Sequence, residues 1–216
     1  MKRIKVASTP TIKRLPAYLH VIEAAAREGK EYISGTVIAE ELELEAIQVR
    51  KDLATTGIIG KPRLGFPVSE LIETINTFLD WNRVHKAILL GSGHLGSALL
   101  GYKVFPRHGL NIVAAFDVDT NRIGTTINGV PVYALPDLKE QVAALDVKMA
   151  ILTVPSTHAQ QVADLLVDCG IEAIWNFTNI KIKVPENVVV QKEDLSSGYA
   201  VLSVKMRLLQ NSQSGE

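Results

Sequence analysis

The chain contains 216 residues, of which 47% are hydrophobic, and its 23 Lys and Arg side chains are balanced by 23 Asp and Glu side chains. This length allows one large globular domain or two modest ones. No apolar run approaches the roughly 18–20 residues that a membrane helix needs, and the basic N-terminus lacks the apolar centre of a secretory signal. The single cysteine, Cys169, cannot form an internal disulfide, so we expect a cytoplasmic protein without a membrane partner.

The charge is distributed unevenly along the chain. Basic residues outnumber acidic ones by 11 to 8 within residues 1–67, whereas acidic residues outnumber basic ones by 15 to 12 in the remainder. This asymmetry is compatible with a nucleic-acid-binding head on an acidic body, and by itself it is weak evidence.

The first third of the chain predicts a helix-turn-helix. Apolar residues at helical spacing predict three short helices, at residues 12–28, 34–42 and 45–55. Ser34 or Thr36 is expected to cap the second helix. The segment IIGKPRLGFPV, residues 58–68, then supplies short β-prone pieces that predict a wing hairpin. We therefore expect a mostly α, winged helix-turn-helix domain at the N-terminus.

On a helical wheel the third of these helices has two faces. The face expected to pack against the other helices carries Ala46, Val49 and Leu53. The opposite face carries Ile47, Gln48, Lys51 and Thr55, with Arg50 at the flank. Because Arg and Lys reach guanine edges or phosphates and Gln reaches adenine, we predict DNA contacts by Gln48, Arg50 and Lys51 on the helix and by Lys61 and Arg63 on the wing. The alternative is a solvated helix that carries a few charges.

The remainder of the chain alternates strands with helices. After a connecting helix predicted at residues 69–84, strands are predicted at 86–91, 111–119, 148–155 and 171–178, and helices at 96–105, 135–145 and 158–170. Such alternation specifies an α/β domain of the Rossmann type, with a parallel sheet covered by helices. The domain boundary is expected between about Pro67 and Lys86. A terminal helix at residues 195–210 carries an apolar stripe from Tyr199 to Leu209 and needs a partner to bury it.

The segment GSGHLG, residues 91–96, follows the first of these strands and opens a helix. Gly91 permits a tight turn, Gly93 lets backbone approach a pyrophosphate, and Gly96 allows close packing of the helix on the sheet. Asp117 ends the second strand, where a carboxylate can accept hydrogen bonds from ribose hydroxyls, which favours NAD over NADP. The alternative is that the glycines shape a turn and Asp117 caps a loop.

Catalysis finds no support in the sequence. A dehydrogenase needs a proton donor or base near the nicotinamide and a substrate pocket, and only a short helical tail follows the Rossmann-like region. His158 is the nearest candidate base, and Tyr102 lacks the Lys four residues later that a short-chain reductase would have, since Pro106 stands there. No group of His, Cys or carboxylates has metal-ligand spacing, so no metal and no enzymatic activity are expected.

The motifs taken together resemble the Rex family of bacterial redox-sensing transcriptional repressors. The resemblance runs through nearly the whole chain, and is carried by KRLPAYL, QVRKDL, GSGHLGSALLGY, FDVDTNRIG, GVPVY, AILTVP, GIEAIWNF and VPENVVVQKEDL. This ordered series is far more specific than any one motif. It implies a DNA-binding domain at residues 1–80, an NAD(H)-binding domain at 81–193 and a dimerisation helix at 194–216 that exchanges between the subunits of a homodimer.

The resemblance also implies a function and a site. Family members respond to the NADH/NAD⁺ ratio: the oxidised or cofactor-free protein binds operator DNA, a double-stranded site, and NADH releases it. The expected cofactor-binding residues are Gly91, Ser92, Gly93, His94, Leu95, Gly96, Tyr102, Asp117, Thr153, Pro155 and Asn176. The expected switch residues are Tyr102, Asp194 and His20, with Asp194 contacting Tyr102 in one state and a basic residue of the DNA-binding head in the other.

Several residues depart from the family pattern. His20 stands where an arginine commonly faces the switch aspartate, and a His20–Asp194 contact would depend on pH near neutrality. Leu195 replaces the aromatic residue that usually follows that aspartate, and ATTG, residues 54–57, replaces a serine–aromatic–aromatic–glycine pattern. Three alternatives therefore stay open: a small NAD-dependent oxidoreductase with its site at a dimer interface, a DNA-binding regulator that binds coenzyme A or another nucleotide, and a regulator that has lost its redox response.

Overall fold

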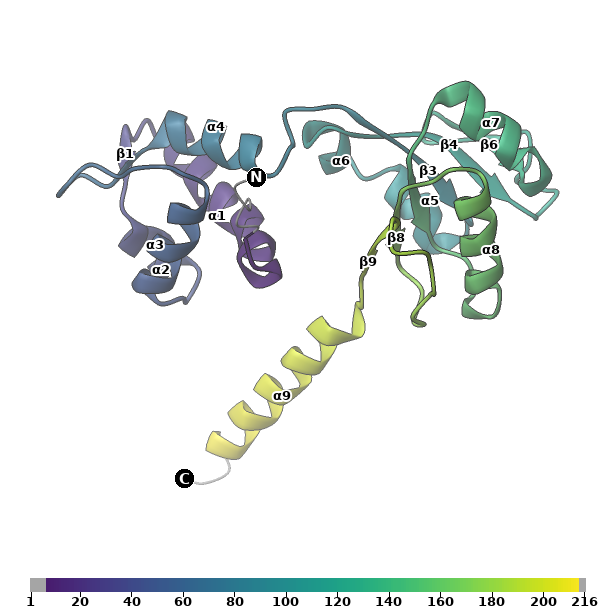
Figure 1. Ribbon diagram of the computed structural model, residues 1–216. Coiled ribbons are helices and arrows are strands. Elements are labelled where there is room, and N and C mark those ends of the chain that lie inside the picture. Colours follow the sequence, from purple (N-terminus) through teal and green to yellow (C-terminus); the bar gives the residue numbers. More distant parts are fainter. Residues whose placement is uncertain (1–6, 214–216) are drawn as a thin grey trace. The chain divides into compact units, whose positions relative to one another are not determined.

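The computed structural model describes residues 7–213, and the outermost parts of the predicted first and third domains, residues 1–6 and 214–216, lie outside the described residues. The chain divides into two compact units, Met1–Arg83 and Val84–Glu216 (Figure 1).

The first unit is helical, with two short strands. Its elements are α1 (Thr9–Arg27), β1 (Tyr32–Ile33), α2 (Gly35–Glu41), α3 (Ala46–Thr55), β2 (Phe66–Pro67) and α4 (Val68–Phe78). Ser34, rather than Thr36, caps α2, because its hydroxyl accepts a hydrogen bond from the N–H of Val37 at 3.2 Å. All four helices contribute to one core, which includes Leu15, Tyr18, Leu19, Ile22, Ile38, Val49, Leu53, Leu71 and Ile75.

The wing is a small hairpin anchored to β1. Lys61 and Gly65 form an antiparallel bridge, and Ile33 pairs with Phe66 in the two-stranded sheet. Gly65 has a φ of 100°, and a Cβ there would lie 2.4 Å from the carbonyl oxygen of Ile33. Only glycine allows this approach of the two backbones. At the tip, Arg63 holds a φ of 66°, an unusual conformation for a residue with a side chain.

Helix α4 ends earlier than the sequence predicts, at Phe78 instead of residue 84. The chain leaves the helix through Asp80, whose φ is 57°. The N–H of Trp81 bonds to the carbonyl of Asn76 at 2.9 Å and that of Asp80 to Thr77 at 3.1 Å, which is the hydrogen-bond pattern of a left-handed helix end.

The second unit is built on a seven-stranded sheet in the order β5-β6-β4-β3-β7-β8-β9. The strands are β3 (His85–Leu90), β4 (Leu110–Asp117), β5 (Thr126–Ile127), β6 (Val130–Ala134), β7 (Met149–Leu152), β8 (Ala173–Asn176) and β9 (Val189–Lys192). All neighbouring pairs are parallel except β5 and β6. Because the chain adds β4 and β6 on one side of β3 and β7 to β9 on the other, the strand order reverses between β3 and β7. Ligands of doubly wound sheets bind beyond the carboxyl ends of the strands at such a point.

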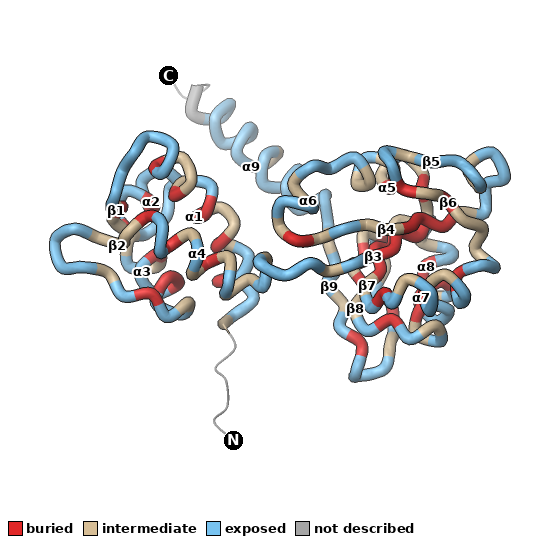
Figure 2. The backbone as a smooth tube through the Cα atoms, turned by 90° about the horizontal axis from the view of Figure 1, so that it is seen from above, coloured by how far each residue is buried: buried red, intermediate tan, exposed pale blue. Residues whose placement is uncertain are grey.

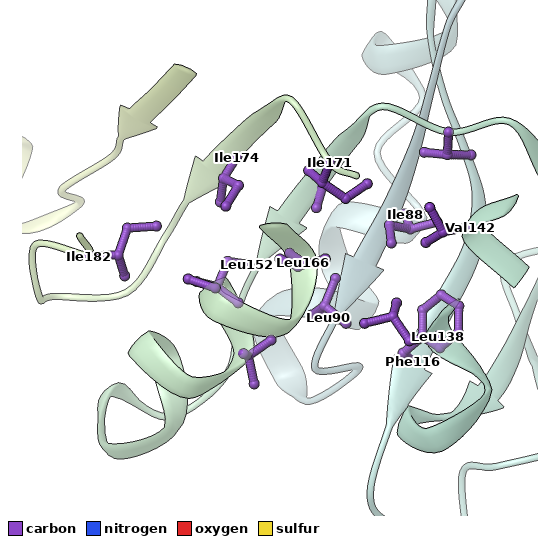
Figure 3. Close-up of a cluster of buried hydrophobic side chains, with 14 of the residues drawn as sticks. Ile88, Leu90, Phe116, Leu138, Val142, Leu152, Leu166, Ile171, Ile174 and Ile182 are labelled. Carbon is purple, nitrogen blue, oxygen red and sulfur yellow. The ribbon is translucent and has the colours of Figure 1, made fainter. Parts of the chain in front are cut away.

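Alternating residues of the strands face two helical layers. Ile88 and Leu90 of β3 belong to a core with α7 (Leu138–Leu145) and α8 (Ser156–Asp168), whose buried side chains are drawn together in Figure 3. Ala87 and Leu89 belong to a second cluster on the opposite face, against which the C-terminal part of α5 (His94–Leu100) packs. This two-sided burial confirms the predicted Rossmann-type architecture.

Three details of the second unit differ from the predicted elements. The helix expected at residues 96–105 is broken into α5 and α6 (Val104–Arg107), since the chain turns at Gly101–Tyr102–Lys103. The hairpin β5–β6 and the edge strand β9 were not expected, because β5 has only two residues and β9 is an exposed edge strand with a weak period-2 pattern. The alternating burial of Val130 and Val132 in β6 was a signal that sequence reasoning missed. The first turn of the helix expected at 135–145 is a 3₁₀ turn, Leu135–Asp137.

The C-terminal helix α9 (Ser196–Gln213) is exposed almost along its whole described length (Figure 2). Its large apolar side chains are 48–73% exposed: Tyr199, Val201, Leu202, Val204, Met206, Leu208 and Leu209. Within residues 7–213, no helix combines the length and apolarity needed to cross a bilayer.

Candidate functional site

The glycine turn lies where β3 ends and α5 begins. Gly91 has a φ of 91°, and a Cβ there would lie 3.1 Å from the backbone of Thr153. A Cβ on Gly96 would lie 2.1 Å from the carbonyl oxygen of Gly91, so the helix can approach the strand only with glycine at this position. A Cβ on Gly93 would meet no atom within 4 Å. Gly93 is therefore not needed for packing and leaves its backbone open to a ligand, as the predicted role requires.

Asp117 at the end of β4 is tied to this turn. Its Oδ2 accepts hydrogen bonds from the Ser92 N–H at 2.7 Å and from the Ser92 hydroxyl at 2.6 Å, while its Oδ1 accepts from the N–H groups of Val118 and Asp119. Burial works against the charged form, yet these hydrogen bonds outweigh it and lower the pKa of Asp117 below its ordinary value. The turn therefore holds a fixed carboxylate where a ribose hydroxyl would arrive.

Two further side chains brace the turn. The Thr153 hydroxyl lies 2.9 Å from the carbonyl oxygen of Leu90 and 2.7 Å from that of Gly91, so it can donate to either. Arg122 donates to the carbonyl of Ser92 and pairs with Asp119 at 3.3 Å. Sequence reasoning missed Arg122, although its place shortly after the strand-ending aspartate was a signal for a residue near the same turn.

A cavity of about 310 Å³ opens beside the turn, at the carboxyl ends of β3, β4 and β7. It is lined by Leu90, Gly91, Phe116, Asp117, Val118, Leu135, Val154, Pro155, His158, Gln161, Val162 and Leu165. The lining is mostly apolar with Asp117 at its edge, which suits a planar heterocycle joined to a ribose. His158 lies in the first turn of α8 and faces this cavity.

The other residues predicted to bind the cofactor have different environments. His94 begins α5 and is exposed, Leu95 is half-buried, and Pro155 is an exposed residue preceding α8. Asn176 is fully buried: its Nδ2 donates to the Ile180 carbonyl at 3.0 Å, and its Oδ1 accepts from both the N–H and the hydroxyl of Thr178. These hydrogen bonds give Asn176 a structural role in shaping the loop after β8.

Tyr102 begins a row of aromatic side chains. Its ring packs edge-on against Phe105 with centroids 4.9 Å apart, Phe105 lies 5.5 Å from Trp175, and Trp175 lies 5.0 Å from Phe177. The indole N–H of Trp175 points to Oε1 of Glu193 at 3.4 Å. Tyr102 itself is 51% exposed, so one end of the row is open to solvent, and Phe177 stands at the other end.

Asp194 forms the N-terminal cap of α9. Its Oδ1 accepts hydrogen bonds from the Ser196 N–H at 2.9 Å and from the Ser196 hydroxyl at 2.5 Å. The hydroxyl contact, followed by that of the backbone N–H, lowers the pKa of Asp194 below its ordinary value. His20 is exposed on α1 of the first unit, whereas Tyr102 and Asp194 belong to the second. The contact predicted between His20 and Asp194 stays a prediction.

In the first unit, the side chain of Asp52 on α3 is only 2% exposed and accepts hydrogen bonds from four side chains. Arg14 of α1 donates through Nε to Oδ2 at 2.7 Å and through Nη2 to Oδ1 at 3.0 Å. Tyr18 donates to Oδ2 at 2.7 Å, and Thr11 and Gln48 donate to Oδ1 at 3.0 and 2.9 Å. This Asp52 network joins α1 to α3.

The network shifts the pKa values of its members. Burial disfavours the charge of Asp52, but the four donors, Arg14 first, lower its pKa to about 2. Burial and the neighbouring Asp52 carboxylate raise the pKa of Tyr18 to about 12. Sequence reasoning missed this network; the signal was an arginine and a tyrosine four residues apart on the apolar side of the first helix.

The predicted DNA contacts occupy different positions around α3 and the wing. Arg50 and Lys51 are exposed on α3, and Arg63 is exposed at the wing tip. Gln48 differs from its expected orientation, since it is half-buried and its amide is held by Asp52. Lys61 donates to the Tyr32 hydroxyl at 2.7 Å, with its ammonium 5.0 Å from the centroid of that ring. Tyr32 thus positions a wing lysine, which the sequence did not indicate.

Across residues 7–213, no three His, Cys, Asp or Glu side chains are grouped so that they could hold a metal ion. The thiol of Cys169 is half-buried, and burial raises its pKa.

Two family models match the chain. One, described as a CoA binding domain, covers residues 82–180, and the other, described as a putative DNA-binding protein N-terminus, covers residues 7–54. The first covers most of the Rossmann-type unit, and the second covers the region of α1, α2 and α3 in the winged unit.

Relatives of known name match nearly the full length. The redox-sensing transcriptional repressor Rex of Treponema denticola is 56% identical over 206 residues, covering 95% of this chain and 98% of the relative. The protein of the same name from Bacteroides thetaiotaomicron is 43% identical over 193 residues, covering 89% and 88%. These relatives are regulators and not enzymes.

A solved structure of RSP in complex with β-NAD⁺ and operator DNA superimposes with a TM-score of 0.86 at 31% identity, covering 98% of this chain and 99% of RSP. RSP, a Rex-family repressor, also gives a TM-score of 0.87 at 29% identity, covering 97% and 98%. The sequence identities, the share of each chain that they cover and the two-unit fold all indicate the same family. The chain belongs to the Rex family of redox-sensing transcriptional repressors.

Proposed function

We propose that this protein represses transcription by binding operator DNA and that NADH releases it, so that the NADH/NAD⁺ ratio sets its occupancy. The observation that carries the proposal is one chain with two distinct surfaces: an open glycine turn held to Asp117, and a winged unit with Arg50, Lys51 and Arg63 exposed. RSP, a Rex-family protein of similar fold, has been solved with β-NADH and with β-NAD⁺ and operator DNA, which supports both halves. A repressor of this kind acts on DNA in the cytoplasm.

The residues of the second unit fit a dinucleotide. Gly93 leaves room for a pyrophosphate, no side chain caps the N–H groups at the start of α5, which would favour its charge, and the Asp117 carboxylate could accept from the adenosine ribose. The apolar cavity beside Asp117 suits the adenine. The nicotinamide, which is positively charged when oxidised and neutral when reduced, supplies the redox signal.

The aromatic row supports a path from that signal to the dimer helix. Tyr102 is exposed at one end of the row, and Glu193, which accepts a hydrogen bond from Trp175 within the row, is adjacent in the chain to the Asp194 cap of α9. A change in charge near Tyr102 biases whether Asp194 bonds toward Tyr102 or toward the basic side of the DNA-binding head. Such bias shifts DNA affinity only if the two arrangements bind the nucleotide unequally.

Homodimerisation through exchanged α9 helices is part of the proposal. The apolar side chains of α9 from Tyr199 to Leu209 remain exposed within this chain, as expected of a helix whose partner is a second copy. A homodimer also presents two winged units to two half-sites of a duplex.

A titration tests the whole proposal. A labelled duplex, selected by the protein from a random library, is bound at fixed salt and then titrated with NADH, NAD⁺ or coenzyme A, with fluorescence anisotropy as the readout. We expect release by NADH at far lower concentration than by NAD⁺ and no release by coenzyme A. Identical curves for the two redox forms would contradict redox sensing, and release by coenzyme A would favour the alternative ligand.

His20 provides the specific reason to test a second function, a regulator without a redox response. In that case NADH leaves DNA binding unchanged, and His20→Arg restores release. Turnover of NADH with a carbonyl compound would instead favour the oxidoreductase.

A further inference from the structure

Residues that read bases on a recognition helix must project outward from its first turns. On α3, the second and third residues are Ile47 and Gln48. The sequence alone favours Gln48 as the reader, because its amide can bond to adenine. The structure favours Ile47 instead. Gln48 is half-buried with its Nε2 2.9 Å from Asp52, whereas Ile47 is 61% exposed.

The hydrogen bond of Gln48 is not easily given up. Its acceptor, Asp52, is almost fully buried and is held in place by Arg14, Tyr18 and Thr11. Turning Gln48 outward to a base would remove one donor from a buried carboxylate, which is costly. Gln48 is therefore a positioning residue, which helps to fix α3 against α1.

Exposed apolar side chains in the winged unit concentrate on the surface expected to meet DNA. Ile47 on α3 and Ile59 and Leu64 on the wing are 61%, 83% and 55% exposed. The other exposed large apolar side chains described in this unit, Ile12, Val37 and Leu44, are only 36–38% exposed. An isolated surface isoleucine needs no explanation, but the most exposed ones here share two elements with Arg50, Lys51 and Arg63.

Ile47 lies one helical turn before Arg50 and Lys51 and on the same side of α3. The two cations bring the helix to the phosphates and to guanine edges of a duplex. The major groove offers one apolar group, the C5-methyl of thymine, which is the natural partner of an aliphatic side chain.

We infer that Ile47 is a specificity-determining residue that packs against a thymine methyl in the major groove, while Gln48 positions the helix and reads no base. The inference rests on the proposed DNA-binding function. The group on the DNA that it names is the C5-methyl of thymine. This methyl can be removed without changing the charge or the base pairing of the duplex.

The test is a thymine-to-uracil scan of a duplex that the full-length protein selects from a random library. Uracil lacks only the methyl group. We expect one thymine in each half-site at which uracil weakens binding about fourfold, the value of one buried methyl-sized group. With Ile47→Ala this penalty disappears, whereas Ile47→Val, which keeps branched methyls, retains most of it.

Two controls separate packing from charge and from folding. Ile47→Ala leaves the slope of log affinity against log salt unchanged, whereas Lys51→Ala reduces it by about one. Gln48→Ala lowers affinity equally for all duplexes and leaves the preferred sequence intact. All variants are first compared with the wild type by circular dichroism.

The outcomes distinguish this inference from the function on which it rests. If the wild type selects no duplex, the proposed function fails. If it selects and binds one, but every uracil penalty persists in Ile47→Ala, the inference about Ile47 alone is overturned. A relaxed preference at an adenine position in Gln48→Ala would overturn the positioning role of Gln48.

Discussion

The guanidinium of Arg14 on α1 meets the carboxylate of Asp52 on α3 side-on, through two hydrogen bonds of 2.7 and 3.0 Å. Arg14 keeps part of its side chain in solvent, at 28% exposure, while that of Asp52 is 2% exposed. The pair thus links the first helix of the winged unit, which also carries His20, to the helix expected to enter the DNA groove. A rotation of α1 would be carried to α3 through this contact.

Removing Asp52 is expected to destabilise the winged unit strongly. Asp52→Ala leaves Arg14 without its carboxylate partner and the buried Tyr18 hydroxyl without its acceptor, which should lower the free energy of unfolding by about 3 kcal/mol. Trp81 packs against the core of this unit, so its fluorescence in a Trp175→Phe background reports urea unfolding. The matched control is Glu28→Ala, because Glu28 pairs with Lys30 at the surface and contributes little. Equal effects of the two substitutions would contradict the structural role of Asp52.

The same carboxylate predicts an acid dependence of stability. The pKa of Asp52 is about 2 in the folded protein, below the ordinary value of 3.8. The stabilisation is therefore fully present above pH 3.8 and is lost as the pH falls through about 2. The difference corresponds to about 2 kcal/mol. Urea midpoints followed by Trp81 fluorescence from pH 6 to pH 2 should fall more steeply in the wild type than in Asp52→Asn; parallel curves would refute the prediction.

Two glycines of the cofactor turn should separate folding from binding. In Gly96→Ala the new Cβ would overlap the Gly91 carbonyl, so we expect a lower melting temperature and no detectable NADH binding. In Gly93→Ala the Cβ meets nothing in the protein, so the fold should persist while NADH affinity drops about tenfold or more. Calorimetric titration and thermal unfolding measure both quantities. Gly198→Ala in α9, also without a close contact, serves as the control; wild-type affinity in Gly93→Ala would show that no ligand approaches there.

Substitutions can separate the helix-capping role of Asp194 from the role of its charge in the proposed switch. Asn is as good a helix cap as Asp, so Asp194→Asn should retain the helicity of α9 while removing the charge. We expect this variant to bind DNA but to lose release by NADH, measured by anisotropy. Ser196→Ala removes the hydroxyl donor to Asp194 and keeps the charge, so it should retain release. Normal release in Asp194→Asn would exclude its charge from the switch.

Local patterns predict much of this fold. Hydrophobic patterning predicts the helices of the winged unit and the four central strands of the sheet, β4, β3, β7 and β8, because each of those elements buries one stripe or both faces. The spacing of Gly91, Gly93 and Gly96 predicts the cofactor turn for a largely local reason, since Gly96 packs on the nearby Gly91 carbonyl and Gly93 has an open approach. The close approach of Gly91 to Thr153 is a tertiary contact that the spacing does not show. The short strand β5 and the exposed edge strand β9 have no such stripe and are recognisable only once paired.

The tertiary structure, and not the local sequence, determines which side chains of α3 point outward. The sequence determined that Gln48, Arg50 and Lys51 lie on one helix, but a helical wheel cannot show that Arg14 and Tyr18 donate to a buried Asp52 carboxylate, which also accepts from Gln48 and turns it inward. That outcome depends on residues more than thirty positions apart, brought together by the packing of α1 on α3. A buried hydrogen-bond network, and not the local pattern, therefore sets which residue points outward at the start of the recognition helix. The reason is that a buried carboxylate is stable only when nearby donors satisfy its oxygens.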